Sequence, residues 1–108
     1  MLVTLPSKNG NIDFELDTSA YADYRFEVNF AKELQCTFQE FVQRIAKQKA
    51  QAKVNYLGIL KILYCYLESD KAPTFISFIK LFDINHAEEM LKKLTEVLEQ
   101  SFKSAVKN

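Results

Sequence analysis

The stretch at residues 55–68, NYLGILKILYCYLE, decides how the rest of the chain must be arranged. At helical spacing it has two apolar faces, the first made by Leu57, Leu60, Leu63, Tyr64 and Leu67 and the second by Ile59, Ile62 and Tyr66. Only Gly58, Lys61 and Glu68 form a narrow polar edge. A membrane span needs about 20 predominantly apolar residues. We therefore expect a short helix that the rest of the protein covers on two sides.

The overall composition is that of one soluble globular domain. The chain has 108 residues, of which 48% are apolar and 26% charged, and this length suffices to bury about two thirds of the unfolded surface. Its formal net charge is zero, which removes the simplest electrostatic reason to expect a nucleic-acid or membrane-surface protein. The first ten residues have no basic region followed by an apolar run, so we expect a cytoplasmic protein without a secretory signal.

The two cysteines do not have the spacing of a metal or redox site. Cys65 falls within the apolar stretch, and Cys36 has no closely spaced partner. A free cysteine commonly behaves as a small buried apolar residue. We therefore expect both thiols to be reduced and to serve packing.

The amino-terminal part is predicted to begin with a β-hairpin. Two runs of β-compatible composition, residues 2–5 and 12–16, flank Asn9-Gly10, which is a strong two-residue hairpin signal. In the second run Ile12, Phe14 and Leu16 alternate with acidic residues. This alternation predicts one apolar face and one acidic face.

Two periodicities compete in residues 18–35. Strand-like alternation with polar residues is shown by Tyr24, Phe26, Val28 and Phe30, whereas one side of a helix would be lined by Tyr21, Tyr24, Val28 and Ala31. We favour a third strand over residues 24–30. Asp17, Thr18 and Ser19 could equally cap a helix, so the helical alternative stays open.

Helical patterns begin at Thr37. Thr37 and Glu40 fit a capping box, in which each side chain satisfies a backbone N–H of the first turn. Apolar residues then follow at helical spacing, namely Phe38, Phe41, Val42 and Ile45. The apolar stripe fades after Ala46, so residues 37–68 form either one bent helix or two.

Two more helices are expected after breaks in the pattern. Pro73 disfavours a helix at Ala72, and Thr74 is a good cap for a short helix over residues 75–82. Asn85, with Glu88 three residues later, predicts the start of the last helix. One face of that helix would be apolar, made by Ala87, Leu91, Leu94, Leu98, Phe102 and Ala105.

No group of residues in the sequence points to catalysis or to metal binding. The single histidine, His86, has no partner at ligand spacing. Gly10 and Gly58 are far apart, so no phosphate-binding loop is indicated. Glu88 and Glu89 fit a favourable interaction with a helix dipole. We expect a protein that is not an enzyme, with no catalytic residue, cofactor or metal.

One basic run gives an indication of nucleic-acid binding. It lies in residues 44–53, contains no acidic residue, and comprises Arg44, Lys47, Lys49 and Lys53. It also lacks aromatic residues on which bases would stack. A solvated helix face is therefore the favoured interpretation.

Residues 74–84, TFISFIKLFDI, are the better candidate for partner binding. Their apolar excess either packs between the central and last helices or faces a partner or another copy of the chain. The candidate partner-binding residues are Phe75, Ile76, Phe78, Ile79, Leu81 and Phe82. A full apolar face already exists without Ile76 and Leu81, so we expect these two to be the most exposed.

The order of these parts resembles that of the tail assembly chaperones of long-tailed bacteriophages and prophages. The likeness rests on the amino-terminal TLPSKNGNIDFEL, the mid-chain helix, the segment TFISFIKLFDI and the amphipathic EEMLKKLTEVLEQS. It implies a protein of the bacterial host cytoplasm that binds the tail tape-measure protein and keeps it soluble during assembly. It also implies self-association, tail-tube subunits as a further candidate partner, and absence from the finished virion.

The expected fold is α+β, in a single domain over residues 1–108. Residues 1–35 would form a β-rich part, either an antiparallel hairpin or a three-stranded sheet, packed on about four helices within residues 36–108. The expected function is that of a phage tail assembly chaperone. The alternative is a small helical adaptor or regulatory domain that binds one folded partner, with nucleic-acid binding through residues 44–53 as a third interpretation.

Overall fold

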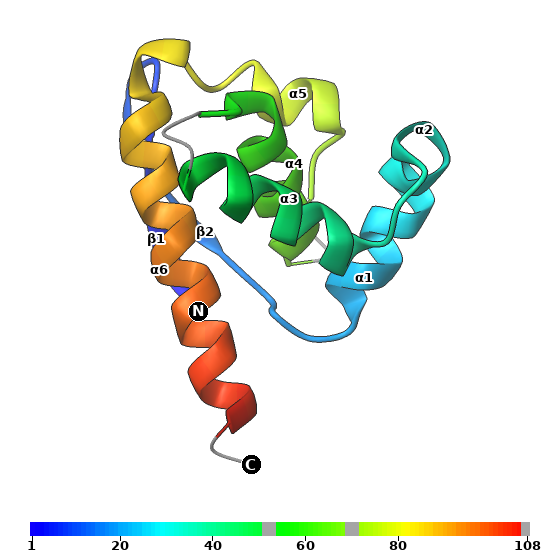
Figure 1. Cartoon of the computed structure of the whole chain (residues 1–108). Coiled ribbons are helices and arrows are strands. Elements are labelled where there is room, and N and C mark those ends of the chain that lie inside the picture. The colour runs from blue at the N-terminus through cyan, green and yellow to red at the C-terminus, as the bar shows by residue number, and fades with distance from the viewer. Residues whose placement is uncertain (51–53, 69–71, 107–108) are drawn as a thin grey trace.

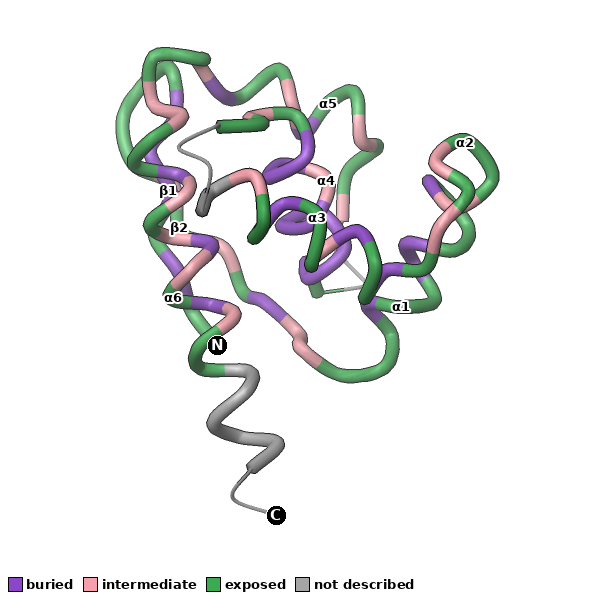
Figure 2. The backbone as a smooth tube through the Cα atoms, viewed as in Figure 1, coloured by how far each residue is buried: buried purple, intermediate pink, exposed green. Residues whose placement is uncertain are grey.

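Helix α4, Tyr56–Tyr66, lies at the centre of the protein (Figure 1). The structure, a computed structural model, describes residues 1–50, 54–68 and 72–106, without the side chains of residues 49, 50 and 101–106. Asn55 caps α4, because its side-chain oxygen accepts a hydrogen bond from the Gly58 N–H at 2.9 Å. Eight residues of this helix are buried, and most of it is purple in Figure 2. The predicted two-sided burial is confirmed, although Leu57 lies at the surface.

The amino-terminal hairpin is confirmed. Strands β1, Leu2–Ser7, and β2, Gly10–Glu15, pair antiparallel, with Leu5 opposite Ile12. Gly10 has a φ of 118°, a conformation that a side chain disfavours and glycine accepts. On the inner face Leu5 is fully buried and Phe14 is half-buried, whereas the acidic residues of β2 alternate with them and lie outside.

The third strand predicted over residues 24–30 is wrong. This region is helical and comprises α1, Tyr21–Phe26, the π-helical η1, Glu27–Ala31, and α2, Lys32–Leu34. A strand would have placed four apolar side chains on one face. The helix instead buries Phe26 and Phe30 and exposes Tyr24 and Val28. The β-rich part therefore ends near residue 16 rather than at residue 35.

Residues that follow α4 pair with the end of the hairpin. Leu16 and Leu67 form an isolated antiparallel bridge. The Asp17 N–H donates to the Tyr66 carbonyl oxygen at 2.6 Å, and the Glu68 N–H donates to the Glu15 carbonyl oxygen at 3.1 Å. The hairpin is thus joined to the central helix by backbone hydrogen bonds.

Helices α3 and α4 are separate elements. Helix α3 spans Phe38–Ala50 and begins with the predicted capping box, since the Thr37 N–H donates to Glu40 Oε1 at 3.0 Å and the Glu40 N–H to Thr37 Oγ1 at 3.1 Å. The expectation that Gly58 belongs to a polar edge is wrong. Gly58 is buried against α3, where an added Cβ would lie 2.5 Å from Ile45 Cδ1. The two helices can approach here because Gly58 has no side chain.

The short helix α5, Phe75–Ile79, begins at Thr74 as predicted and ends three residues earlier than expected. The next cap is Asp83 rather than Asn85. Its carboxylate accepts a hydrogen bond from the Asn85 N–H at 3.0 Å, because a 3₁₀ turn, η3 at Ile84–His86, precedes the last helix. Helix α6 then spans Ala87–Val106.

The buried face of α6 differs from the predicted one. Met90, Leu94 and Val97 are fully buried, whereas Leu91 and Leu98 are half-buried. Leu91 and Leu98 of the predicted stripe pack against the core from its edge, so the centre of the buried face is displaced from the predicted one toward Met90 and Val97. Phe102 and Ala105 lie outside the described side chains.

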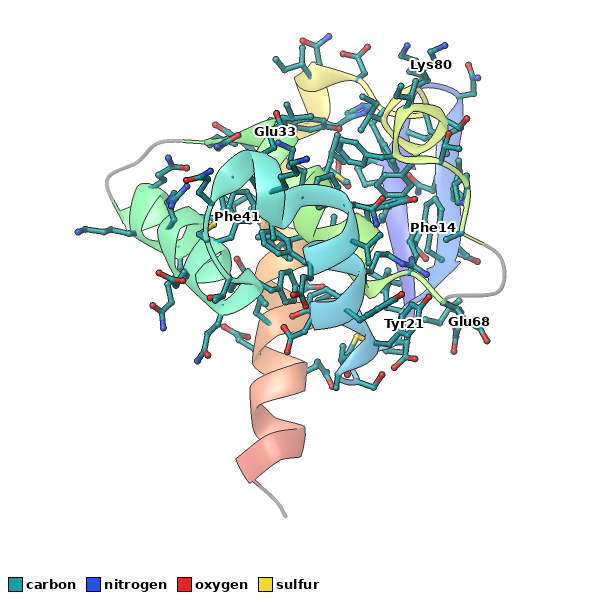
Figure 3. The ribbon with its side chains drawn as sticks, turned by 90° about the vertical axis from the view of Figure 1, so that its right-hand side faces the viewer. Phe14, Tyr21, Glu33, Phe41, Glu68 and Lys80 are labelled. Atoms are coloured by element: carbon teal, nitrogen blue, oxygen red, sulfur yellow. The ribbon has the colours of Figure 1, made fainter. Side chains whose placement is uncertain are left out.

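These helices enclose α4. It packs against α1, α3, α5 and α6, and α6 also contacts β1. Aromatic side chains fill the space between Phe41 on α3 and Phe14 on the hairpin (Figure 3). Cys65, within α4, is buried and free, and burial raises the pKa of its thiol to about 12. Cys36 is also free and is half-buried, so neither cysteine is in a disulfide, as expected.

Candidate protein-binding surfaces

The segment predicted to bind a partner presents a small apolar surface. Ile76 is 64% exposed and Leu81 is 37% exposed, which confirms the expected exposure of these two residues. Ile84, three residues after Leu81, is 74% exposed. The segment that holds them runs along the edge of the molecule that also holds the hairpin turn (Figure 1). We call Ile76, Leu81 and Ile84 the α5 surface.

Two of the predicted contact residues belong to the core instead. Phe78 is fully buried and Phe82 is nearly so. Their rings are 4.9 Å apart, and Phe78 also contacts the rings of Phe14 and Tyr64 at 5.7 and 5.6 Å. They cannot meet a partner directly in this conformation. Their role is to attach the α5 surface to the hairpin and to α4.

The remaining two predicted residues, Phe75 and Ile79, are half-buried. The Phe75 ring packs edge-on against Phe30 of η1 at 4.9 Å and against Tyr64 at 5.3 Å. The Tyr64 hydroxyl donates a hydrogen bond to the Pro73 carbonyl oxygen at 2.7 Å. Tyr64 therefore holds the amino end of α5 in two ways, through its ring contact with Phe75 and through its hydrogen bond to the Pro73 carbonyl oxygen.

The loop after α5 is fixed to the hairpin turn. The Lys8 N–H donates a hydrogen bond to the Leu81 carbonyl oxygen at 2.9 Å. Because the Leu81 backbone is held in this way, its side chain is presented on an ordered scaffold. Ordered apolar side chains lose less entropy when a partner binds them than side chains on a free loop.

A second apolar surface lies on the outer side of α1 and η1. Tyr21, Tyr24 and Val28 are spaced three and four residues apart and are 40%, 58% and 64% exposed. The rings of Tyr21 and Tyr24 are 5.6 Å apart. The helical alternative in the sequence grouped these residues correctly. Sequence reasoning missed this surface because the strand was favoured, and because a helical stripe is more often core than surface.

Arg25 fixes how α1 is rotated against α4. This side chain is buried, and its Nη1 donates a hydrogen bond to the Tyr64 carbonyl oxygen at 3.1 Å. Its guanidinium lies over the rings of Tyr21 and Tyr64, 5.2 and 5.6 Å from their centroids. These contacts offset part of the cost of taking a cation out of water. The position of Arg25 leaves Tyr24 and Val28 facing solvent.

A third surface is a groove of about 840 Å³, which we call the α3–α6 groove. One wall comes from α3, one from α6 and one from residues 18–23, and Tyr66 of α4 also contributes. Its apolar lining includes Phe38, Val42, Ile45, Leu91, Leu94 and Leu98. Sequence reasoning could not find it, because its residues come from four segments that are far apart in the chain.

The groove has an acidic rim. The charged residues that line it are Asp23 and Glu99, and no lysine, arginine or histidine of the described residues does so. Just before the groove residues 18–23, hydrogen bonds from the N–H and the hydroxyl of Ser19 lower the pKa of the Asp17 carboxyl. The groove is therefore suited to an apolar occupant that carries positive charge.

The basic run begins on the outer side of α3. Arg44 and Lys47 are exposed there, while the side chain of Lys49 and all of Lys53 lie outside the described residues. The described part of the run thus has two cations on a solvated helix face. Nucleic-acid binding through this run stays a prediction.

Metal-ligating side chains do not gather at one place in the described residues. Among the described residues, no group of three or more His, Cys, Asp and Glu could hold a metal ion. The half-buried His86 lies in η3, and the groove that it lines with residues of α6 contains both acidic and basic side chains.

The chain matches no protein-family model, no curated protein and no solved structure. In the described part of the chain, no helix is long and apolar enough to cross a membrane.

Proposed function

We propose that this chain is a tail assembly chaperone of a long-tailed bacteriophage or prophage, which acts by binding and without catalysis. It would bind the tape-measure protein in the host cytoplasm and keep it soluble until tail-tube subunits assemble around it. It would not remain in the finished virion. The resemblance in the order of parts supports this proposal, together with the apolar surfaces that the fold leaves uncovered.

The observation that carries the proposal is the α5 surface. Three branched apolar side chains lie exposed within nine residues, on a segment whose neighbouring Phe78 and Phe82 anchor it in the core. Single exposed apolar residues are ordinary, whereas several exposed apolar residues on one anchored segment fit a protein-binding site. An unassembled helical client offers apolar side chains that such a surface would cover.

The client interaction can be tested by co-expression with the full-length tape-measure protein of the same genome. The chain should keep this client soluble and co-purify with it. The double variant Ile76→Ser/Leu81→Ser should retain its far-UV circular dichroism and lose most of this effect. A matched control, Leu2→Ser/Leu57→Ser, removes two exposed apolar side chains elsewhere and should behave like the wild type.

Two results would contradict the proposal. In the first, the client stays insoluble and unbound in the presence of the wild-type chain. In the second, both double variants keep the client soluble equally well, which would place the contact away from the α5 surface.

A further inference from the structure

We propose that the α3–α6 groove binds a small organic ammonium ion, a molecule with an apolar body and a protonated amine, and that Asp23 and the Tyr66 hydroxyl bind the amine. The groove is a separate surface from the α5 surface, and this site needs no client. Binding of the amine therefore holds or fails independently of the chaperone proposal.

The first observation concerns the size and lining of the groove. It lies where α3, α6 and the start of α1 meet at the end of α4 (Figure 1). Its volume of about 840 Å³ falls within the range of roughly 300–1,000 Å³ that is typical of small-molecule sites. Val42, Leu91 and Leu98 line it and are half-buried. A ligand that covers these side chains removes apolar surface from water, which favours binding.

The second observation is a hydroxyl at the end of α4 that lacks a hydrogen-bond partner. Tyr66 lines the groove and is 6% exposed, yet its hydroxyl forms no hydrogen bond with any described residue. Burial raises the pKa of this hydroxyl to about 12, and the charge of Asp23 contributes to the rise. The hydroxyl is therefore neutral at physiological pH and lies within electrostatic reach of Asp23. Its oxygen can accept a hydrogen bond from an ammonium group, which would satisfy it.

The third observation is that aromatic rings and a carboxylate both line the groove. The rings of Phe38 and Tyr66 have centroids 5.5 Å apart and planes at 71° to each other. Asp23 lies in the first turn of α1, and its carboxylate forms no ion pair or hydrogen bond with the described residues. Aromatic rings attract an ammonium group through cation–π interactions, and a carboxylate attracts it through charge-assisted hydrogen bonds.

The fourth observation concerns competing cations. The charged residues in the lining are Asp23 and Glu99, and no described lysine, arginine or histidine lines the groove. Arg25, which is close to Asp23 in the chain, is buried and donates its hydrogen bond to the Tyr64 carbonyl oxygen. A cationic ligand would therefore meet negative charge that no lining residue compensates, whereas an anion would be repelled.

Fluorescence titration of the purified full-length chain with dansylcadaverine tests the site, because this probe joins an apolar fluorophore to a primary ammonium group. Its N-acetylated form has the same apolar body without the charge. We expect the wild-type chain to bind the ammonium form at least about tenfold more tightly, the effect of one charge-assisted hydrogen bond. Asp23→Asn should remove this preference. Circular dichroism checks that each variant is folded.

Three further variants locate the site. Tyr66→Phe should weaken binding of the ammonium form about two- to tenfold, the effect of one hydrogen bond, and leave binding of the acetylated form unchanged. The control Glu33→Gln removes a negative charge from an exposed residue of α2 outside the groove and should leave both affinities unchanged. Ile76→Ser/Leu81→Ser should also bind both forms normally, which separates this site from the α5 surface.

Several results would overturn the proposal. They are no binding of the probe, equal affinity for its two forms, a preference that Asp23→Asn leaves intact, and loss of binding in the α5 double variant. Sedimentation of the chain without the probe tests for another occupant. A dimer that Asp23→Asn converts to a monomer would place a second copy in the groove and would also overturn the proposal.

Discussion

Replacing Phe78 by alanine separates a core role for this residue from a partner-binding role. The side chain is fully buried, and its ring lies 4.9 to 5.7 Å from those of Phe82, Tyr64 and Phe14. Phenylalanine-to-alanine changes in cores cost about 3–5 kcal/mol, and each lost ring pair adds about 0.5–1.5 kcal/mol to the area term. The measured range for the whole change already includes such ring contacts, so we expect a loss of about 4 kcal/mol.

That loss is large for a chain of this size. Typical domains unfold with about 5–15 kcal/mol, so the Phe78→Ala protein would keep only a small margin of stability. Urea unfolding followed by far-UV circular dichroism measures the difference in unfolding free energy between wild type and variant. The comparison requires that the slope of the unfolding free energy against urea concentration is the same for both. Phe78→Leu should lose much less, because it leaves a smaller cavity.

The matched control is Ile76→Ala, two residues away on the same short helix. This side chain is 64% exposed, so its loss should change the unfolding free energy by less than about 0.5 kcal/mol. Equal losses at the two positions, or a loss below about 1.5 kcal/mol for Phe78→Ala, would refute the assignment of Phe78 to the core.

Three further predictions concern local features. Hydrogen bonds from the N–H and the hydroxyl of Thr37 lower the pKa of Glu40, so the stability that they contribute is present above pH 4.5 and is lost as the pH falls through the lowered pKa. Acid unfolding of Glu40→Gln should show a smaller loss, because this variant has no carboxyl to protonate, and an unchanged profile would contradict the capping box. A thiol reagent should modify Cys36 in the native protein and Cys65 only on unfolding, since burial raises the pKa of the Cys65 thiol to about 12. Rapid modification of both thiols in the native protein would show that the reagent reaches Cys65 within α4, which contradicts its burial. Gly10→Ala should lower the free energy of unfolding in urea by about 1–2 kcal/mol, because residue 10 has a positive φ. An unchanged free energy would imply that the hairpin turn has a different backbone conformation.

Features with local causes could be predicted from the sequence. The hairpin turn needs only Asn9-Gly10, and the starts of α3 and α5 need only the side chains of Thr37 and Thr74. The burial of the central helix on two sides could be predicted because it has more apolar residues than one face of a helix can hold. Each of these signals depends on residues within a few positions of one another.

Features that depend on distant contacts could not be predicted in this way. Residues 24–30 fit two periodicities, and the decision between them comes from Phe26, Phe30 and Arg25 packing against other helices. Gly58 is buried because Ile45 approaches it from α3. For the same reason, the sequence indicates the α5 surface at Ile76 and Leu81 but contains no local sign of the α3–α6 groove.

We propose that the chain coats an unassembled client through exposed apolar residues. Native mass spectrometry of the complex co-purified with the tape-measure protein tests it most directly. We expect several copies of the chain on one client, and loss of those copies with Ile76→Ser/Leu81→Ser. A complex of one chain with one client would favour the adaptor alternative, and no complex at all would contradict the claim.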